Sequence, residues 1–431
     1  MNLQPPRGTR DFPPSEMIKR ELVIGVIKNI FERYGFDPFE SPAIEYWELL
    51  SKKGVGGEEI KDEIYYFKDK GDRELALRFD LTTPLARFVA ANPQLVKPFK
   101  RYQIGRVWRY DRPQAGRYRE FWQADIDIIG SSSMSCEAEC LSVANDVMTE
   151  LGFKEFIIRI NNRKILNGIL EALDIPEKKS IPVFRTLDKI DKIGKDEVFM
   201  ELKKLIGKKS EKLKEFVEIS NEDVLKTVKI LKDELSGYTV LEEGADEIEK
   251  IYRFCKMYGF SKRIKIDLSL VRGLDYYTGP IFEVSLSGKN IGSVAGGGRY
   301  DNLIELFGGR WTPAVGISFG IERIIDVMKA EDMLDTLERK TSVLVASATD
   351  DMRPWAIKIA QKLRKNGINT ETDLMERNLK SQLDYADRAK IPYVIIVGEK
   401  EVKKGKVTIK DMAKRKQAIV SIEKVIRFFG K

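Results

Sequence analysis

The segment from Arg101 to Gly130 reads RYQIGRVWRYDRPQAGRYREFWQADIDIIG. Apolar and polar residues alternate on both sides of its central DRPQAG run, which predicts a strand, a loop and a second strand. Six arginines lie in its first twenty residues, at positions 101, 106, 109, 112, 117 and 119. A guanidinium stays charged at physiological pH, and its planar fork matches phosphate and carboxylate oxygens. The hairpin therefore predicts a site for nucleotide phosphates, with an exposed basic hairpin paired to surface acids as the alternative.

The composition is that of a soluble globular protein. The 431 residues are 42% hydrophobic and 33% charged, and this length predicts roughly two to four domains. Cys136, Cys140 and Cys255 are too few for a disulfide framework or a four-cysteine zinc site, which indicates a reducing compartment. We find no signal-peptide pattern and no apolar segment long enough to span a bilayer. We therefore expect a cytoplasmic protein without a membrane partner.

Histidine is absent from the chain. This absence removes the commonest general base, the commonest transition-metal ligand and every Ser-His or Cys-His nucleophile. Any catalysis must therefore rely on arginine, lysine, carboxylates, tyrosine and bound metal.

Basic residues are in excess at the C-terminal end. Residues 342–431 contain 20 Lys plus Arg against 11 Asp plus Glu, a balance of +9 in a chain whose formal net charge is +8. This asymmetry predicts an anionic macromolecular partner, most simply nucleic acid. A lysine-rich solubilising surface is the alternative.

The hydrophobic pattern divides the chain into segments of different type. Helical periodicity predicts helices over residues 16–34, 81–91 and 135–151, whereas residues 36–45, 64–79, 155–160, 263–270, 281–285 and 314–319 have the pattern of strands or extended segments. A Lys/Glu-rich helical pattern between residues 161 and 259 separates these strands and indicates an insertion. From Val343 to Val397 strands alternate with helices, which predicts a small α/β domain with a largely parallel sheet.

Three further segments combine glycine with arginine. They read LVRGLDYYTG from Leu270, AGGGRYD from Ala295 and AVGISFGIER from Ala314. The glycines of the second segment allow the backbone to approach a ligand without side-chain obstruction. The third segment runs a strand into a helix whose first turn holds Arg323. Each segment alone is as consistent with a turn or with packing as with a binding site.

Taken in order with the arginine hairpin, these segments resemble class II aminoacyl-tRNA synthetases, and LVRGLDYYTG with AGGGRYD points to the histidyl-tRNA synthetase family. PPRGTRD (residues 5–11) and LRFDLTTP (residues 77–84) are similar to the same family, so the resemblance covers nearly the whole chain. It implies an α+β catalytic domain with a six-stranded antiparallel sheet. Motif 1, near Phe31–Leu50, would form a homodimer interface, the arginine hairpin would be motif 2, and Gly316–Arg323 would be motif 3.

The resemblance also implies a domain order. Catalytic segments would occupy residues 1–165 and 257–330, separated by a helical insertion at 166–256, and a linker at 331–341 would lead to an α/β anticodon-binding domain at 342–431. The insertion would lie over the acceptor arm of the tRNA. The basic C-terminal domain would read the anticodon, in line with the dominance of phosphate contacts in nucleic-acid affinity.

The reaction that the resemblance implies has two steps. The carboxylate of L-histidine attacks the α-phosphorus of ATP with release of pyrophosphate, and the histidyl-adenylate then passes its histidyl group to the 3′-terminal ribose of tRNA(His). Such transfers need alignment and charge neutralisation more than an added nucleophile. A chain without histidine therefore loses nothing essential for this chemistry.

Individual residue roles follow from the same resemblance. Arg109 and Arg272 would be the catalytic cations at the reacting phosphate and carboxylate. Histidine contacts would come from Asp80, Thr82, Arg109, Gln123, Asp127, Arg272, Tyr276 and Tyr277, ATP contacts from Arg109, Asp111, Phe121 and Arg323, and contacts with the tRNA acceptor arm from Arg112 and Gln114. Mg²⁺ would accompany ATP, held mostly by phosphate oxygens and waters with about one or two carboxylates that the sequence does not identify.

The hairpin departs from the usual family pattern at two positions. Asp111 stands where glutamate is more common, which shortens that carboxylate side chain by one methylene. Trp122 stands where histidine is frequent, in line with the histidine-free composition. We hypothesise that the lack of histidine lets a cell keep making this chain when histidyl-tRNA is scarce. Drift at dispensable positions is the alternative.

Three other functions fit parts of the pattern. A catalytically inactive paralogue that senses histidine or tRNA would keep the fold, but Arg109, Arg272, Arg323 and a full C-terminal domain are all retained. A class II synthetase for threonine, proline or glycine is disfavoured by the RGLDYY run. A generic nucleic-acid-binding protein fits the charge but leaves the glycine and arginine segments unexplained.

Overall fold

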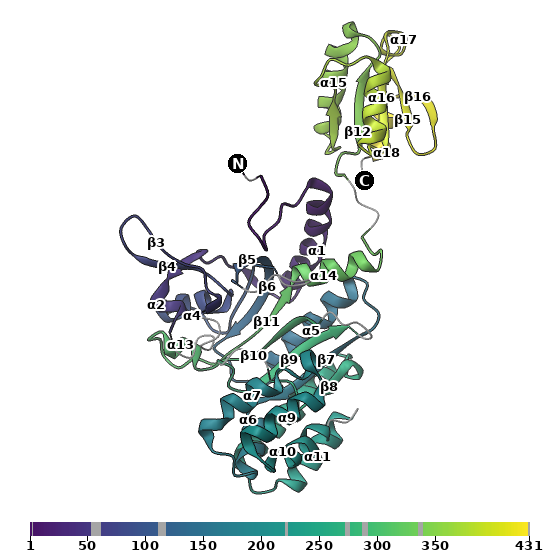
Figure 1. Ribbon diagram of the computed structural model, residues 1–431. Coiled ribbons are helices and arrows are strands. Elements are labelled where there is room, and N and C mark those ends of the chain that lie inside the picture. The colour runs from purple at the N-terminus through teal and green to yellow at the C-terminus, as the bar shows by residue number, and fades with distance from the viewer. Residues whose placement is uncertain are drawn as a thin grey trace. The chain divides into compact units, whose positions relative to one another are not determined.

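The computed structural model describes residues 1, 3–52, 62–110, 118–219, 223–271, 276–286, 292–334 and 339–429. The chain forms two compact units, which are described separately (Figure 1). The larger unit consists of Met1–Asp11 and Leu22–Met333, and the smaller unit of Phe12–Glu21 and Leu334–Lys431. In the described ranges no helix is both long and apolar enough to cross a membrane.

An eight-stranded sheet forms the centre of the larger unit. The strand order across it is β1 (Asp37–Pro38), β5 (Phe99–Trp108), β6 (Glu120–Ile129), β11 (Ala314–Gly320), β10 (Ser293–Arg299), β9 (Pro280–Leu286), β7 (Phe156–Asn162) and β8 (Ile264–Ile266). The strands from β5 to β7 in this order pair antiparallel, whereas β1 beside β5 and β8 beside β7 are parallel. The expected six-stranded antiparallel sheet is therefore present, and a short parallel strand extends each edge.

Helices cover one face of this sheet. They are α1 (Pro14–Arg33), α5 (Ser135–Glu150) and α14 (Ile321–Ala330). Phe31 of α1 packs against the rings of Tyr102 on β5 and Phe319 on β11, with centroid distances of 5.8 and 5.7 Å. The helix and the strands that the sequence periodicity predicts therefore pack in one core.

Short elements cover the other face, which we call the site face. They are α2 (Trp47–Leu50), α4 (Thr82–Ala91), α13 (Leu303–Leu306) and a small sheet in the order β2 (Ile44–Tyr46), β4 (Glu74–Leu77), β3 (Tyr66–Lys68). A buried cluster that includes Phe79, Leu85 and Val89 joins them to Ile129 and Ala314 at the ends of β6 and β11. This second layer leaves the middle of β6 and β11 to polar residues.

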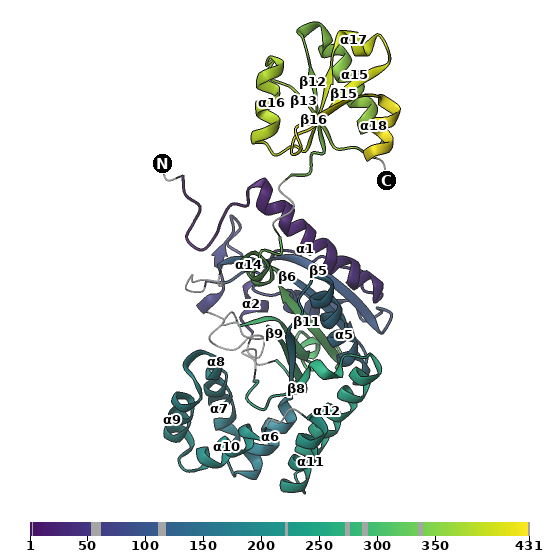
Figure 2. The same ribbon diagram turned by 90° about the vertical axis from the view of Figure 1, so that its right-hand side faces the viewer.

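The Lys/Glu-rich segment folds as a helical module between β7 and β8. Its members are α6 (Arg163–Ala172), η1 (Glu177–Lys179), α7 (Ser180–Leu187), α8 (Ile190–Ile193), α9 (Lys195–Ile206), α10 (Lys209–Glu218), α11 (Val224–Glu234), α12 (Thr239–Met257) and η2 (Ser261–Arg263). They gather at one end of the larger unit (Figure 2). Close approaches lock α6 to α12, since a Cβ at Gly168 would lie 2.5 Å from Cβ of Leu241. We call this module the insertion.

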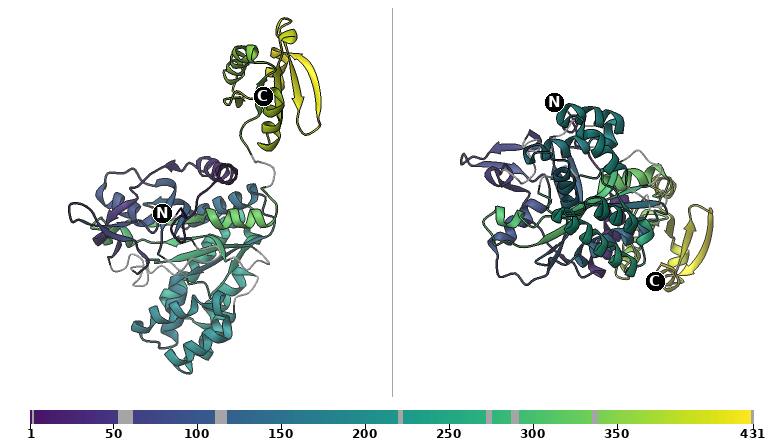
Figure 3. Two further views of the ribbon diagram at one scale, coloured as in Figure 1. Left: turned by 45° about the horizontal axis from the view of Figure 1, so that its top comes forward. Right: turned by 90° about the horizontal axis from the view of Figure 1, so that it is seen from below.

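The smaller unit holds a five-stranded sheet. Its elements in chain order are β12 (Val343–Ser347), η3 (Asp350–Met352), α15 (Arg353–Arg364), β13 (Thr370–Thr372), α16 (Leu379–Arg388), β14 (Tyr393–Val397), α17 (Glu399–Val402), β15 (Lys406–Asp411), β16 (Lys416–Ser421) and α18 (Ile422–Phe429). The strands β13, β12 and β14 are parallel, as the alternation predicts. The sequence did not predict the antiparallel hairpin β15–β16, drawn in yellow in Figure 3, because lysines mask its apolar alternation.

Candidate active site

Polar residues gather on the site face along β6. Gln123, Asp125 and Asp127 alternate on this strand, so their side chains point to one side of the sheet. The residues directly opposite Asp127 are Arg101 on β5 and Gly316 on β11. The predicted arginine hairpin and the predicted motif 3 strand are therefore neighbours in the sheet.

Glycines in β10 and β11 permit unusually close approaches. A Cβ at Gly316 would lie 2.1 Å from Oδ1 of Asp127, and a Cβ at Gly297 would lie 1.9 Å from the carbonyl oxygen of Gly316. Neither position has room for a methyl group. The glycines of AGGGRYD lie within a strand, and at Gly297 the close approach is to the neighbouring strand. Close packing of β10 against β11 therefore explains why position 297 is glycine.

Asp127 is buried and held by two protein groups. Its Oδ2 lies 2.6 Å from Nη2 of Arg101, whose side chain is fully buried, and the hydroxyl of Tyr300 donates a hydrogen bond to its Oδ1. Burial raises the pKa of Asp127, and the charge of Arg101 opposes this rise. Arg101 thus forms a buried structural ion pair and is not one of the hairpin arginines that can meet a phosphate.

Three tyrosines come together beside Asp127. The ring of Tyr300 lies 5.8 Å from that of Tyr276, and the rings of Tyr276 and Tyr277 are 4.9 Å apart. All three are 7% exposed or less. Tyr300 belongs to AGGGRYD but is missing from the sequence-predicted site. Arg272, which precedes the tyrosine pair in the chain, lies outside the described residues.

Gln123 and Asp125 each have a polar atom without a hydrogen-bond partner in the described part of the chain. Nε2 of Gln123 donates to Oγ of Ser318 on β11 over 2.7 Å. Among the described residues, neither Oε1 of Gln123 nor Oδ1 of Asp125 has a hydrogen-bond partner, although both atoms are buried. Burial raises the pKa of Asp125 to about 7, against the opposing charge of Arg101. Asp125 and Ser318 were missed by the sequence reasoning, although the QADID alternation places Asp125 on the same face as Gln123.

Asp80 and Thr82 lie at the start of α4. Asp80 is 3% exposed, and its two carboxylate oxygens accept hydrogen bonds from the backbone N–H of Thr83 (3.0 Å) and from its hydroxyl (3.1 Å). Burial raises the pKa of Asp80, whereas these hydrogen bonds and the nearby charge of Arg109 lower it. Thr82 is the first residue of the helix. The structure thus brings Asp80 close to Arg109.

Arg109 follows β5 and lies against Phe121 of β6. Its Nε donates to the carbonyl oxygen of Phe79 over 3.0 Å, and its guanidinium carbon is 5.4 Å from the centre of the Phe121 ring. Two of the predicted ATP contacts are therefore adjacent. The positions predicted for further ATP and tRNA contacts, Asp111, Arg112 and Gln114, fall outside the described residues.

Motif 3 joins the hairpin through an acidic residue. Glu322, in the first turn of α14, is 3% exposed and accepts a hydrogen bond from the backbone N–H of Trp122 over 2.8 Å. The adjacent Arg323 donates from Nη1 to the carbonyl oxygen of Ser293 over 2.7 Å. Arg323 therefore lies beside the start of β10, on the helix that Glu322 fixes to β6.

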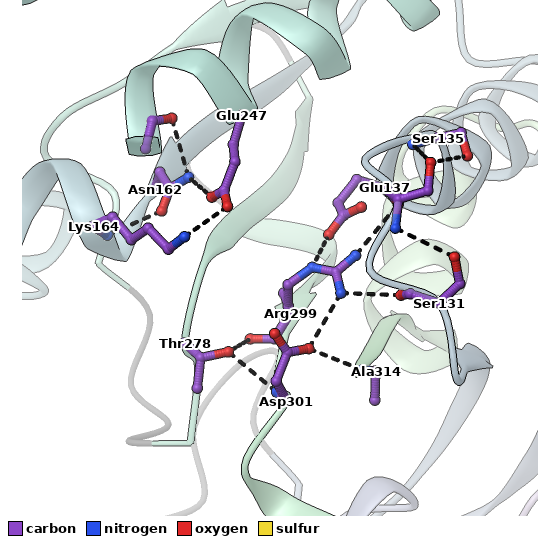
Figure 4. Close-up of polar contacts among 12 residues, drawn as sticks. Ser131, Ser135, Glu137, Asn162, Lys164, Glu247, Thr278, Arg299, Asp301 and Ala314 are labelled. Carbon is purple, nitrogen blue, oxygen red and sulfur yellow. Dashed lines mark hydrogen bonds and ion pairs between the residues drawn. The ribbon is translucent and has the colours of Figure 1, made fainter. Parts of the chain in front are cut away.

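Arg299, the arginine of AGGGRYD, points away from the site. Its Nε lies 2.5 Å from Oε1 of Glu137 on α5, and its Nη1 lies 3.2 Å from Oδ1 of Asp301 (Figure 4). The backbone N–H of Asp301 donates to the hydroxyl of Thr278 over 3.1 Å. This buried network holds the residue that follows Tyr277, so Arg299 supports the tyrosines from behind the sheet.

The family comparison accounts for these motifs together. A family model described as histidyl-tRNA synthetase matches residues 8–324. The chain belongs to the histidyl-tRNA synthetase family. A second model, described as an anticodon binding domain, matches residues 340–431. The class II catalytic domain and the C-terminal α/β domain that the sequence predicts are thus confirmed.

Relatives within the histidyl-tRNA synthetase family extend over almost the entire chain. A histidine–tRNA ligase from Aeropyrum pernix is 43% identical over 98% of this chain and 97% of its own length, and one from Korarchaeum cryptofilum is 42% identical over 96% of each. The crystal structure of histidyl-tRNA synthetase from Nostoc sp. PCC 7120 superposes with a TM-score of 0.87 at 33% identity, covering 99% of this chain and 100% of that one.

A structure with a different title shares the fold. An ATP phosphoribosyltransferase regulatory subunit/histidyl-tRNA synthetase from Bacillus halodurans superposes with a TM-score of 0.76 at 22% identity, covering 89% of this chain and 96% of that one. Identity at this level shows a common architecture. The closer agreement is with the histidine–tRNA ligases.

Proposed function

We propose that this chain is a histidine–tRNA ligase that forms histidyl-adenylate from L-histidine and ATP and then esterifies the 3′-terminal ribose of tRNA(His). The observation that carries the proposal is full-length similarity at about 40% identity to histidine–tRNA ligases. The site adds a buried acid, a cluster of tyrosines and an arginine beside an aromatic ring, which suit an imidazole and a nucleotide.

The histidine pocket would lie between Asp127 and the tyrosines. Each oxygen of Asp127 has one protein partner and can accept a further hydrogen bond, so an imidazole N–H can donate to it. Gln123 offers its Oε1 on the same face, and this atom has no hydrogen-bond partner among the residues that the structure describes. A site that hydrogen-bonds a substrate group rejects amino acids lacking that group, because its own buried polar atoms would be left unpaired.

Asp80 and Thr82 would receive the α-ammonium group of histidine. A buried carboxylate is costly unless it meets a positive charge, and burial already raises the pKa of Asp80. The substrate ammonium would supply that charge beside the start of α4.

Arg109 and Arg272 would neutralise the reacting phosphate and carboxylate. No side chain needs to transfer a proton or form a covalent bond in this step, because the histidine carboxylate is itself the nucleophile and pyrophosphate the leaving group. Fixed cations that face developing charge lower the barrier without reorganisation. Phe121 would stack on adenine beside Arg109, and Arg323 would hold the distal phosphates. Asp111 would be a further contact with ATP.

Magnesium would bind with ATP. In the portion of the chain that the structure describes, no three acidic, cysteine or histidine side chains form a group that could hold a metal ion. Mg²⁺ keeps several waters and binds through substrate phosphates with few protein carboxylates. When bound, the ion would offset the negative charge of the phosphates.

The tRNA would contact three regions. Residues 342–431 carry the +9 charge balance, and lysines of the β15–β16 hairpin, including Lys406, Lys414 and Lys416, are exposed. We assign anticodon binding to this domain. We assign the acceptor arm of the tRNA to the predicted helical segment at residues 166–256, which lies within the insertion, and the first base pair of that arm to Arg112 and Gln114. Phosphate contacts of this kind dominate affinity.

A homodimer would form at the motif 1 region. Ile44 and Tyr46 share one face of β2 and are 45% and 55% exposed. Large apolar side chains grouped on one small sheet mark an interaction surface, and a second copy of this chain is the occupant that the family resemblance implies. Sedimentation velocity of the purified protein tests it, and Tyr46→Glu should shift a dimer to monomer.

The activity is tested by ATP–pyrophosphate exchange with Mg²⁺ and each of the twenty amino acids separately. Exchange with histidine alone is expected, followed by acylation of tRNA(His). Exchange with another amino acid would overturn the pocket assignment. No exchange from folded protein would indicate the inactive paralogue that senses histidine or tRNA.

A further inference from the structure

Two adjacent asparagines join the insertion to the tyrosine segment. Asn161 and Asn162 end strand β7, are both fully buried, and directly precede helix α6. Because they are neighbours on a strand, their side chains point to opposite faces of the sheet. Each therefore contacts a different part of the molecule.

Asn161 holds the segment that leads into the tyrosines. Its Nδ2 donates to the carbonyl oxygen of Leu270 over 2.8 Å. The same segment is held at its far end, where the backbone N–H of Arg163 donates to the carbonyl oxygen of Gly279 over 2.9 Å. Tyr276 and Tyr277 lie between these two attachments, and so does Arg272 in the sequence.

Asn162 holds the insertion. Its Nδ2 donates to the carbonyl oxygen of Gly244 (3.2 Å) and to Oε2 of Glu247 (2.7 Å), both on α12, and its Oδ1 caps α6 by accepting from the backbone N–H of Lys164 (3.0 Å). Lys164 also pairs with Glu247 at 2.8 Å (Figure 4). A Cβ at Gly244 would lie 2.9 Å from the backbone nitrogen of Ile165, so α6 and α12 are in close contact here.

The two asparagines are also bonded to each other. The backbone N–H of Asn162 donates to the side-chain Oδ1 of Asn161 over 2.8 Å. Adjacent hydrogen bonds therefore connect α6 and α12 to Leu270 and Gly279. Buried networks of this kind rigidify their members only when every partner is present.

We propose that Asn161 and Asn162 are positioning residues that couple the insertion to the Tyr276–Tyr277 pocket, so that the position of the insertion sets the affinity for histidine. Neither side chain touches the reacting atoms. Small misplacements of a binding group are costly in catalysis. The mechanical coupling stands on the contacts alone, whereas its effect on histidine binding rests on the proposed function.

Hydrogen exchange of the backbone amides tests the coupling without any substrate. Asn162→Asp keeps the acceptor that caps α6 but loses the donor to Gly244 and Glu247. We expect it to accelerate exchange in residues 276–286 as well as in α6 and α12. Acceleration confined to α6 and α12 would overturn the coupling. Lys164→Gln, a milder change at the same junction, keeps the test open if Asn162→Asp does not fold.

The kinetics of ATP–pyrophosphate exchange test the effect on histidine binding. Asn161→Asp keeps the acceptor for Asn162 and loses the donor to Leu270, so we expect the KM for histidine to rise about tenfold with a smaller change in kcat and in the KM for ATP. The double variant should raise the KM for histidine no further than the more affected single variant does, since both substitutions interrupt the same path of hydrogen bonds. Additive effects, or a loss of kcat at unchanged KM, would indicate a merely structural role.

A matched control separates this path from general loosening of the insertion. Lys203 pairs with Glu211 at 3.0 Å between two other helices of the insertion. Lys203→Gln removes a Lys–Glu pair as Lys164→Gln does. It should change neither the hydrogen exchange of residues 276–286 nor the KM for histidine. If the wild type itself shows no histidine-dependent ATP–pyrophosphate exchange, the proposed function fails. Hydrogen exchange of the backbone amides still tests the coupling in that case.

Discussion

Asp125 should give the protein a pH-dependent stability near neutrality. Burial raises its pKa in the fold to about 7, above the roughly 3.9 of an unfolded Asp. The fold therefore favours the protonated form, so this group lowers the free energy of unfolding as the pH rises from about 4 to 7, by at most about 1.4 kcal/mol per pH unit. Asn cannot ionise, so Asp125→Asn should gain stability relative to wild type across that window.

Urea unfolding at pH 5, 6, 7 and 8 measures this difference. Asp384→Asn is the control, because Asp384 is exposed on α16 and its replacement should leave the pH dependence as in the wild type. Parallel stability curves for wild type and Asp125→Asn would contradict the prediction. The absence of histidine makes the measurement clean, since no imidazole titrates in this range.

Tyr300→Phe should weaken histidine binding more than ATP binding. The change removes the hydroxyl that donates to buried Asp127 and leaves that carboxylate with one partner fewer. We expect a loss of about 1–3 kcal/mol in the free energy of unfolding and a higher KM for histidine in pyrophosphate exchange. Tyr102→Phe is a matched control, since its hydroxyl also donates to a carboxylate, that of Glu32, over 2.9 Å. An equal rise in the KM for histidine in both variants would refute the specific role.

Site residues whose partners are distant in the sequence could not be predicted from local patterns. Gln123 and Asp127 were accessible from the QADID alternation and the family resemblance. Tyr300 lies within a motif that was recognised, yet its partner Asp127 is on another strand, and no local pattern links the two. The same applies to Asn161, whose partner Leu270 lies beyond the whole insertion.

At the scale of elements, strand β10 should not tolerate alanine. Gly297→Ala places a methyl group against the backbone of β11, and such overpacking typically costs about 1–3 kcal/mol or more. Gly25→Ala is the matched control, because Gly25 lies in α1 with nothing within 4 Å of its Cβ position. Ala in a helix interior is favoured over Gly by about 0.5–1 kcal/mol. Thermal unfolding should therefore shift in opposite directions, and equal shifts would contradict the strand-packing argument.

Elements with clear periodicity were predicted well, and elements that depend on neighbours were not. The paired strands β5 and β6 and the helices α5 and α14 follow directly from alternation and helical spacing. AGGGR has no hydrophobic pattern and becomes strand β10 only because β9 and β11 flank it. The hairpin β15–β16 is similar, since one of its faces is exposed and rich in lysine.

At the scale of the whole molecule, the histidine-free sequence should sustain synthesis of the chain during histidine limitation. A ribosome stalls at a codon whose charged tRNA is scarce, and this chain presents no such codon for histidine. Trp122→His introduces one at a half-exposed position that lies over Arg106, with 5.6 Å from the guanidinium carbon to the ring. Pulse labelling of histidine-starved cells should show the wild type made at a higher rate than this variant.

Trp122→Gln separates the codon effect from a folding effect. It loses the same ring without adding a histidine codon, so its synthesis rate should match that of the wild type under starvation. With histidine supplied, all three chains should be made at equal rates. If Trp122→His and wild type are made equally during starvation, the composition has no protective value at this position and drift becomes the better explanation.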